Sequence, residues 1–479
     1  MGQESENPFA REYHGQTTLH PLGLAAVLVL GGLMLILPRR YAVWPMIALA
    51  CFVPPAQRVV IATLDFNLLR LMVVFGWCRI LTRGEFVFAW KPLDWLLLIA
   101  TAYRTLAGVL LYRSFGALIS QLGLAFDILG MYFLFRALVR DWDDVRSLLR
   151  GFLWVSVPVT LAFIVEYATA RNIFSIFGGV PATTGIRDGR LRCQGAFAHP
   201  ILAGCFWAAI LPLFVSEWWS GASGKSRALL GIATSGCIIL ACSSSTPVMG
   251  VAAVGIGWAA FYCRAWLRTI RWAVFATLVA LHLIMVAPVW HLITRITIVG
   301  GSTGYHRYAL INGAIIHLDE WWLIGSNKGT AHWGYHLFDV TNYYIVHGLH
   351  GGIPLLAMFI GSIALGFRGV GRITRATQDR SRLMLAWGLG VAVLVHTFSF
   401  LGVTYFGQIV MIWYLTLATI TGLEVHVARS AGTDGNRRPA PAADRARRRR
   451  LSNTVGGVPG AAGGGIPVGQ VGLVGGEQQ

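Results

Sequence analysis

Long apolar runs recur through most of this 479-residue chain and leave few folds open to it. A helix needs about 20 predominantly apolar residues to cross the hydrocarbon core of a bilayer. In lipid the backbone must satisfy its own polar groups, so such runs predict an all-α membrane protein. The runs lie near residues 20–37, 41–55, 61–82, 92–112, 115–139, 151–169, 199–217, 227–241, 246–263, 272–290, 344–367, 383–402 and 405–425. They predict a polytopic protein of 12–13 transmembrane helices, because the runs at 41–55 and 227–241 are short enough for one of them to be re-entrant.

The composition excludes a soluble globular protein. Hydrophobic residues make up 55% of the chain and charged residues 13%, and the mean hydropathy is +0.61. The formal net charge of +18 belongs mainly to short loops and to the tail, so it indicates contact with membrane lipids and no nucleic-acid partner. Seven cysteines occur without CxxC spacing, mostly in or beside apolar runs, so neither a zinc site nor a disulfide framework is expected.

The distribution of basic residues predicts the topology. Arginines cluster in the short loops at 264–271 and 368–382 and again from Arg429 onward, and the positive-inside rule places these segments in the cytoplasm. The loops at about 170–199 and 291–343 then lie outside. Thirteen spans would put the N-terminus outside as well, and twelve would put it inside.

Three regions follow from this pattern. Residues 1–19 form a polar N-terminal segment, and residues 20–428 form the polytopic membrane domain. Residues 429–479 are rich in Pro, Ala, Arg and Gly without an apolar period, and we expect them to form a disordered, basic and glycine-rich cytoplasmic tail.

The first outer loop carries RDGRLRCQGAFAHP at 187–200, with three arginines within six residues. Guanidinium groups bind phosphate in bidentate fashion and stay charged at any physiological pH, so Arg187, Arg190 and Arg192 are candidate ligands for an anion. The alternative is that they extend toward lipid headgroups, or that Asp188 partners Arg187. His199 precedes Pro200 and either begins the next helix or lines a pocket.

The second outer loop holds most of the remaining polar chemistry. Aromatic and aliphatic residues at near-helical spacing over 305–324 predict an amphipathic helix along the membrane interface. Candidate site residues in or beside this helix and farther along the loop are His306, Arg307, His332, His336, Asp339 and Asn342. His332 and His336 are four residues apart, yet surface histidines of a loop are the favoured interpretation, and no metal is predicted.

In order along the chain, GAFAHPILAG, SSSTP, GYHRYALINGAIIHLDEWWLIGSNKG and DVTNYYIVHGLHGGIPLL resemble the O-antigen ligase and O-antigen polymerase superfamily. The resemblance covers roughly residues 150–370 by motif. It implies a GT-C-like glycosyltransferase of the bacterial inner membrane, with a large periplasmic loop containing an amphipathic helix and an active site that faces the periplasm. The expected partners are an undecaprenyl-diphosphate-linked glycan donor, a glycan acceptor, membrane lipids, and in addition a chain-length regulator and a flippase. The family needs no metal, and no cofactor is expected.

The resemblance also assigns roles to residues. Arg307, Arg190 and Arg192, and less closely Arg187, match arginines that contact the diphosphate. Asn342 matches the second member of a His-Asn pair, but Thr341 stands where the family has histidine. This departure leaves Asp339, His336 and His332 as alternatives for the general base that takes the proton of the acceptor hydroxyl.

Two further functions stay open. An O-antigen ligase, which transfers the chain to a lipid A core, shares donor and chemistry with a polymerase; the missing histidine favours a polymerase of an O-antigen or exopolysaccharide. A lipid-linked oligosaccharide flippase or exporter is favoured by ionisable residues in or near the apolar runs, because such residues commonly mark transport paths. These residues are Asp65, Arg70, Arg104, Asp127, Arg136 and Glu166.

Overall fold

The computed structural model describes residues 17–61, 64–86, 89–295 and 303–435. Its helices are α1 (Pro21–Ile36), α2 (Trp44–Phe52), α3 (Leu68–Arg83), α4 (Pro92–Tyr112), α5 (Phe115–Leu138), α6 (Trp142–Thr169), α7 (Pro200–Ser216), α8 (Ala222–Ala241), α9 (Ser245–Tyr262), α10 (Leu267–Ile284), α11 (Thr303–Ile316), α12 (Leu318–Trp321), α13 (Tyr343–Ala376), α14 (Arg380–Ser399) and α15 (Gln408–Gly435). Two short antiparallel hairpins join β1 (Arg58–Ile61) to β2 (Leu64–Asn67) and β3 (Ile186–Arg187) to β4 (Arg190–Leu191). Of the predicted terminal regions, residues 1–16 and 436–479 lie outside the described residues, and α15 continues past the boundary predicted at 428.

The chain is a mostly helical, multi-pass membrane protein. Each of the thirteen apolar runs overlaps one helix, and nine helices of the described part are long and apolar enough to cross a membrane. The predicted count of twelve spans is reached only if α1, α3 and α8 also cross the membrane. A count of thirteen also needs a crossing by α2 together with the extended residues that follow it. These four are shorter or less apolar than the nine.

Helix α2 has nine residues, about 14 Å of helix, which is too short to cross a bilayer alone. The chain continues in an extended conformation toward the end of the bundle where α1 begins, because Pro54 and Pro55 follow the helix and cannot continue it. The backbones of Thr18 and Arg58 then pair, with Thr18 N donating to Arg58 O at 3.1 Å and Arg58 N to Thr18 O at 2.9 Å. The segment after α1 therefore runs back to the side where α1 begins, as a crossing segment would.

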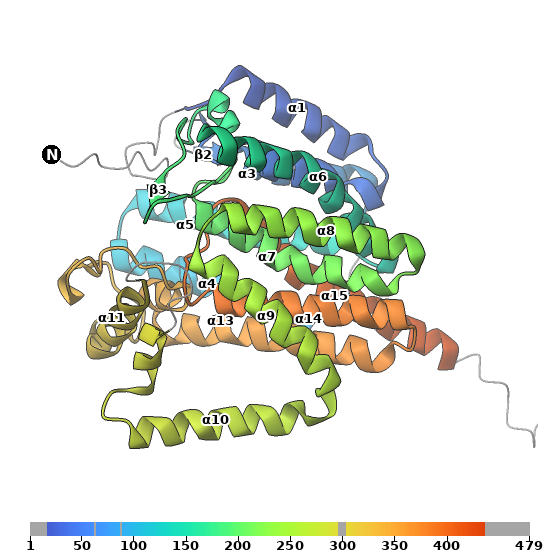
Figure 1. Cartoon of the computed structure of the whole chain (residues 1–479). Helices are drawn as coiled ribbons and strands as arrows, with labels where there is room; N and C mark the ends of the chain where they lie inside the picture. Colours follow the sequence, from blue (N-terminus) through green and yellow to red (C-terminus); the bar gives the residue numbers. More distant parts are fainter. Residues whose placement is uncertain (1–16, 62–63, 87–88, 296–302, 436–479) are drawn as a thin grey trace, which may run out of the picture. The chain divides into compact units, whose positions relative to one another are not determined.

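The two ends of the bundle (residues 1–429) have different polar chemistry. At one end, called the basic end, Arg39 contacts Asp141 and Asp144, and Arg372 contacts Glu424. At the other end, called the site end, the β1–β2 hairpin, the loop at 170–199 and residues 303–342 come together; there Gln57 donates from Nε2 to the backbone oxygen of Phe177. Figure 1 shows α7, α8, α13, α14 and α15 running between these ends.

Helix α13 is broken at Gly351 and Gly352, where the loop that precedes the helix docks. Gly352 has φ +67°, and a Cβ there would lie 2.3 Å from the backbone oxygen of Leu323. Only glycine accepts this conformation and this close approach. The backbone N–H of Ile353 donates to Trp322 O at 2.8 Å, so the break fixes the loop against the bundle.

Most charges inside the bundle are paired. Asp94 and Arg136 are almost fully buried and lie 3.1 Å apart, and Arg70 contacts Asp127 through two bonds. Arg58 contacts Asp65 at 2.7 Å. Such pairs join helices and compensate the cost of burying each charge, so they need no transport role to explain them.

We expect Asp94→Ala to lower the free energy of unfolding by about 3–5 kcal/mol, because it leaves Arg136 buried without its carboxylate. Unfolding in mixed micelles measures this. The double variant Asp94→Leu with Arg136→Met should recover most of the loss, since it removes both charges and fills the space. A double variant as unstable as Asp94→Ala would contradict the charge-pair explanation.

Candidate functional site

A cleft of about 620 Å³ opens at the site end. Its walls come from the β3–β4 hairpin, the start of α7, the turn between α8 and α9, α11, the segment before α13 and the loop between α14 and α15. The lining residues are Arg187, Asp188, Arg190, Arg192, His199, Ile201, Leu202, Ser243, Ser244, Ser245, Thr246, His306, Arg307, His336, Phe338, Asp339, Val340, Thr341, Gly402, Val403, Thr404 and Phe406.

Eight of the ten residues expected at the site line this one cleft; they are Arg187, Arg190, Arg192, His199, His306, Arg307, His336 and Asp339. The other two have different positions. Asn342 is buried as the N-cap of α13, where Oδ1 accepts from the backbone N–H of Tyr344 at 3.0 Å and of Ile345 at 3.2 Å. His332 contacts Glu320, and neither lines the cleft. The structure therefore does not bring Asn342 and His332 together with the other eight residues in the cleft.

Arg307 on α11 is the most deeply placed charge of the cleft, with 4% of its surface exposed. Nη2 donates to Thr246 Oγ1 at 2.8 Å, and Nη1 lies 3.9 Å from Met249 Sδ. Both partners are neutral, and among the described residues no carboxylate lies within ion-pair distance. Burial lowers the pKa of Arg307 from its usual value, although a guanidinium keeps its proton in proteins. Arg307 is thus a buried cation that still needs an anion.

Gly402 allows this placement. A Cβ at position 402 would lie 2.8 Å from Thr246 Oγ1 and 3.0 Å from Arg307 Nη2. The loop between α14 and α15 was not expected at the site, because GVTYF is short and almost uncharged. It lines the cleft because Thr404 Oγ1 donates to Val340 O at 2.6 Å and so ties the loop to the segment before α13.

The β3–β4 hairpin presents Arg187 and Arg190 together. The two residues are directly opposite each other in the antiparallel pair, so their side chains project from the same face. Asp188 and Gly189 both have positive φ, which type I′ turns require, and Asp-Gly is a strong hairpin signal that the sequence offered. Two like charges facing each other are unfavourable unless an anion lies between them. Asp188 approaches Arg187 only at 3.8 Å and at an exposed position.

Arg192 follows the hairpin and is partly buried. Its Nε is buried and donates to no acceptor in the described structure. Burial lowers the pKa of Arg192, and the neighbouring Arg187 lowers it further. An unpaired buried N–H is costly, so this position suits a bound acceptor atom.

Glu166 at the end of α6 holds this loop in place. Its carboxylate accepts from the backbone N–H groups of Gln194 at 3.1 Å and Gly195 at 2.9 Å, and from Thr184 Oγ1 at 3.1 Å. Asn172 Nδ2 adds a bond to Gly195 O at 2.8 Å. Glu166, one of the residues that favoured a flippase in the sequence, thus has a local structural role, because all these bonds anchor the arginine loop.

Two helix N-termini also reach the cleft. Ser245 and Thr246, the first residues of α9, line the cleft. The N-cap residue of this helix, Ser244, makes no capping hydrogen bond with its side chain. His199 caps α7, with Nδ1 accepting from Ile201 N at 3.2 Å. Burial, then Arg192 and Arg187, lower the pKa of His199 to about 4, so the ring is neutral at pH 7. Helix N-termini attract anions through free N–H groups and the helix dipole.

The mouth of the cleft carries the candidates for a base. His336 and Asp339 are exposed, and His336 has φ +60° with its ring 3.9 Å from that of Tyr335. The positive φ at His336 is not helical, so His332 and His336 do not form the one-turn pair that their spacing allowed. His306 Nε2 lies 3.2 Å from the backbone oxygen of Asp339 and connects α11 to this segment.

The cleft contains four arginines against two carboxylates, a formal excess of two positive charges. The arrangement can therefore hold a ligand with about two negative charges. The chain matches no protein-family model and no curated protein sequence, so the chemistry of the cleft rests on its geometry.

We expect Glu166→Gln to loosen the arginine loop. The amide nitrogen of Gln cannot accept, and each hydrogen bond to a charged acceptor contributes about 1.5–3 kcal/mol. Trypsin should then cleave after Arg187, Arg190 or Arg192 roughly tenfold faster or more, because cleavage follows the population of the open loop. Tyr167→Phe, at an exposed neighbour on α6, is the matched control. Equal cleavage rates in both variants would show that Glu166 does not hold the loop.

Proposed function

We propose that this protein is a membrane glycosyltransferase that polymerises glycan repeats carried on undecaprenyl diphosphate. The observation that carries the proposal is the buried guanidinium of Arg307, which faces a cleft with three more arginines and has only neutral partners. A lipid diphosphate diester carries two permanent negative charges and matches the excess charge of the cleft. The resemblance to the O-antigen polymerase and ligase superfamily supports the same ligand.

The charge of the two bundle ends supports the orientation. Arg39, Arg140, Arg264 and Arg372 lie in connections or helix ends of the basic end, and the positive-inside rule puts that end in the cytoplasm. The cleft then faces the periplasm of a bacterial inner membrane, and the segment at 291–343 is a periplasmic loop of a GT-C-like enzyme.

In the proposed reaction the bond between the anomeric carbon and the diphosphate oxygen breaks, and a bond from that carbon to an acceptor hydroxyl oxygen forms. The negative charge that develops on the leaving diphosphate is stabilised by Arg307, Arg192 and the helix N-termini. The proton of the hydroxyl passes to a base at the mouth, for which Asp339 and His336 are the candidates. Direct displacement inverts the configuration at the anomeric carbon.

Two alternative functions, a ligase and a flippase, account for fewer of these observations than a polymerase does. A ligase would share the donor site and differ in the acceptor, and Thr341 in place of the family's histidine favours the polymerase. A flippase would need free charges inside the membrane. Asp94 pairs with Arg136, and Arg70 pairs with Asp127, whereas Arg104 in α4 has a buried Nε without an acceptor among the described residues and is the observation that fits a flippase.

Transfer by Arg307→Ala or Arg192→Ala should fall about 100- to 1,000-fold, since each removes a donor aimed at the developing charge. The experiment complements a deletion strain with each variant and measures polymer and lipid-linked intermediates. We expect outward-facing single repeats to accumulate. Arg171→Ala is the matched control, an exposed arginine of the same loop outside the cleft.

Normal polymer from both cleft variants would overturn the diphosphate site. Repeats trapped on the cytoplasmic side in the deletion strain would favour the flippase. If the deletion strain makes full-length polymer that stays attached to undecaprenyl diphosphate, with none on the lipid A core, the result would favour the ligase.

Binding of the donor should tighten by a factor of a few as the pH falls from 7 to 5. After burial, the positive charges of Arg192 and Arg187 also lower the pKa of His199. A bound diphosphate offsets these charges, so the pKa of His199 rises and binding of the donor takes up a proton. The lipid diphosphate diester does not titrate in this range. A titration of affinity against pH measures the effect.

His199→Asn keeps a good N-cap for α7 but cannot titrate. Its donor affinity should be constant over the same pH range. An unchanged pH dependence in this variant would assign the effect to another group.

A further inference from the structure

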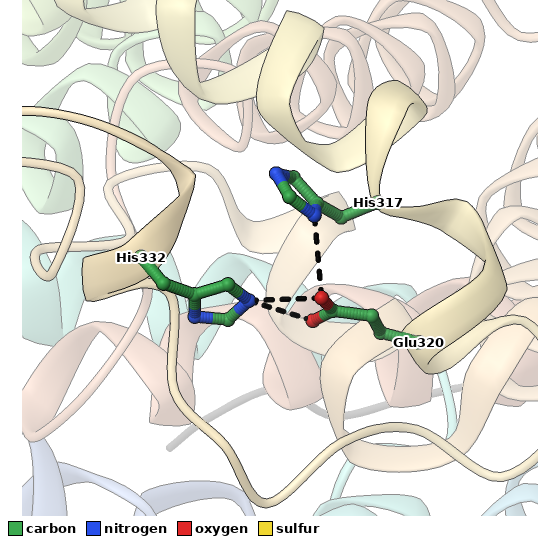
Figure 2. A group of neighbouring side chains, drawn as sticks. All are labelled: His317, Glu320 and His332. Carbon is green, nitrogen blue, oxygen red and sulfur yellow. Dashed lines mark hydrogen bonds and ion pairs between the residues drawn. The ribbon is translucent and has the colours of Figure 1, made fainter.

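A second polar cluster lies in the loop that closes the cleft, and none of its members lines the cleft. His317 comes directly before α12, Glu320 lies within α12, and His332 belongs to a short 3-10 turn at Ala331–Trp333. His332 Nε2 is 2.8 Å from Glu320 Oε2, and His317 Nδ1 is 3.2 Å from Glu320 Oε1. The three ligand atoms lie within 4.8 Å of one another, and Figure 2 shows both rings turned toward the carboxylate.

Packing holds these side chains in place. The ring of Trp333 stacks on that of His317, with centroids 5.7 Å apart and an angle of 3° between the planes. Trp333 Nε1 also points toward Glu320 Oε2 at 3.5 Å. Trp333 is buried with Trp321, Leu310 and Leu337 in a small apolar core of the loop. The donors therefore need little rearrangement to converge on one ion, which favours binding.

The donor set selects the kind of ion. Two imidazole nitrogens and one carboxylate oxygen suit Zn²⁺, which binds such groups at about 2.0–2.2 Å and completes a tetrahedron with water.

We propose that His317, Glu320 and His332 bind a zinc ion that fixes the periplasmic loop. This site differs from the pair His332 and His336 that sequence spacing allowed, and it adds a metal where none was expected.

The position of the cluster gives the ion a structural role. It joins α12 to the turn at His332, and a few residues farther along the chain His336 and residues 338–341 line the cleft. A bound ion would add a further link between α12 and the segment that leads to α13. The ion does not take part in the proposed transfer, and the site can be tested without any assumption about the function of the cleft.

The test uses the full chain in detergent, purified without a histidine tag and stripped of metal. Titration with ZnCl₂ should give one saturable site per chain and raise the unfolding temperature. Titration with Co²⁺ should give the visible d–d bands of a tetrahedral site. Glu320→Gln and His332→Ala should each weaken Zn²⁺ binding at least about tenfold.

Asp319→Asn is the matched control, since this exposed neighbour in α12 has the same charge and lies outside the cluster. It should bind Zn²⁺ as the wild type does. The proposal is overturned if the wild type shows no saturable binding near pH 7.5, or if Glu320→Gln retains wild-type affinity. Because the first outcome needs only the wild-type chain, a variant that fails to fold leaves the test decisive.

Discussion

A charge removed from water must be compensated, and this constraint separates the two kinds of charged residue in the bundle. Asp94 with Arg136, and Arg70 with Asp127, satisfy it internally and join helices. Arg307 is buried to a similar degree but contacts only a hydroxyl and a thioether. Among the described residues Arg307 is therefore a buried positive charge held in place without a counter-charge, and it lies in the wall of the cleft.

The helical architecture follows from the sequence because lipid leaves so few alternatives. All thirteen apolar runs became helices, but several boundaries moved for local reasons. Helix α6 begins at Trp142 and not near 151, because Asp141 and Asp144 form a capping box that starts the helix in a polar segment. The amphipathic helix expected over 305–324 ends at Ile316 and is followed by the separate α12. Hydropathy reports where apolar residues are, whereas caps and turns decide where a helix begins and ends.

The candidate site was predictable in part. The clustering of arginines at 187–192 pointed to Arg190 and Arg192 as anion ligands, and the family resemblance pointed to Arg307; all three line the cleft. Their convergence was not predictable, because it depends on how the β3–β4 hairpin, α11 and the α14–α15 loop pack. The position of Asn342 could not be predicted for a related reason: the residue type that suits a pocket also suits a helix N-cap, and only the bonds from Tyr344 and Ile345 show that Asn342 caps α13.

The loop that carries Arg307 is held by the bundle at several separate points. Arg307 bonds to Thr246 on α9, Tyr343 N donates to Phe400 O at 2.8 Å, and the break at Gly352 receives the backbone of Trp322 and Leu323. These contacts come from α9, α14 and α13, so the width of the cleft depends on how three helices pack. A guanidinium stabilises a leaving diphosphate most when water is excluded, since the local dielectric sets the strength of the interaction. The same contacts that position Arg307 also cover it, and for this reason the arginine and the loop around it are best understood as one element.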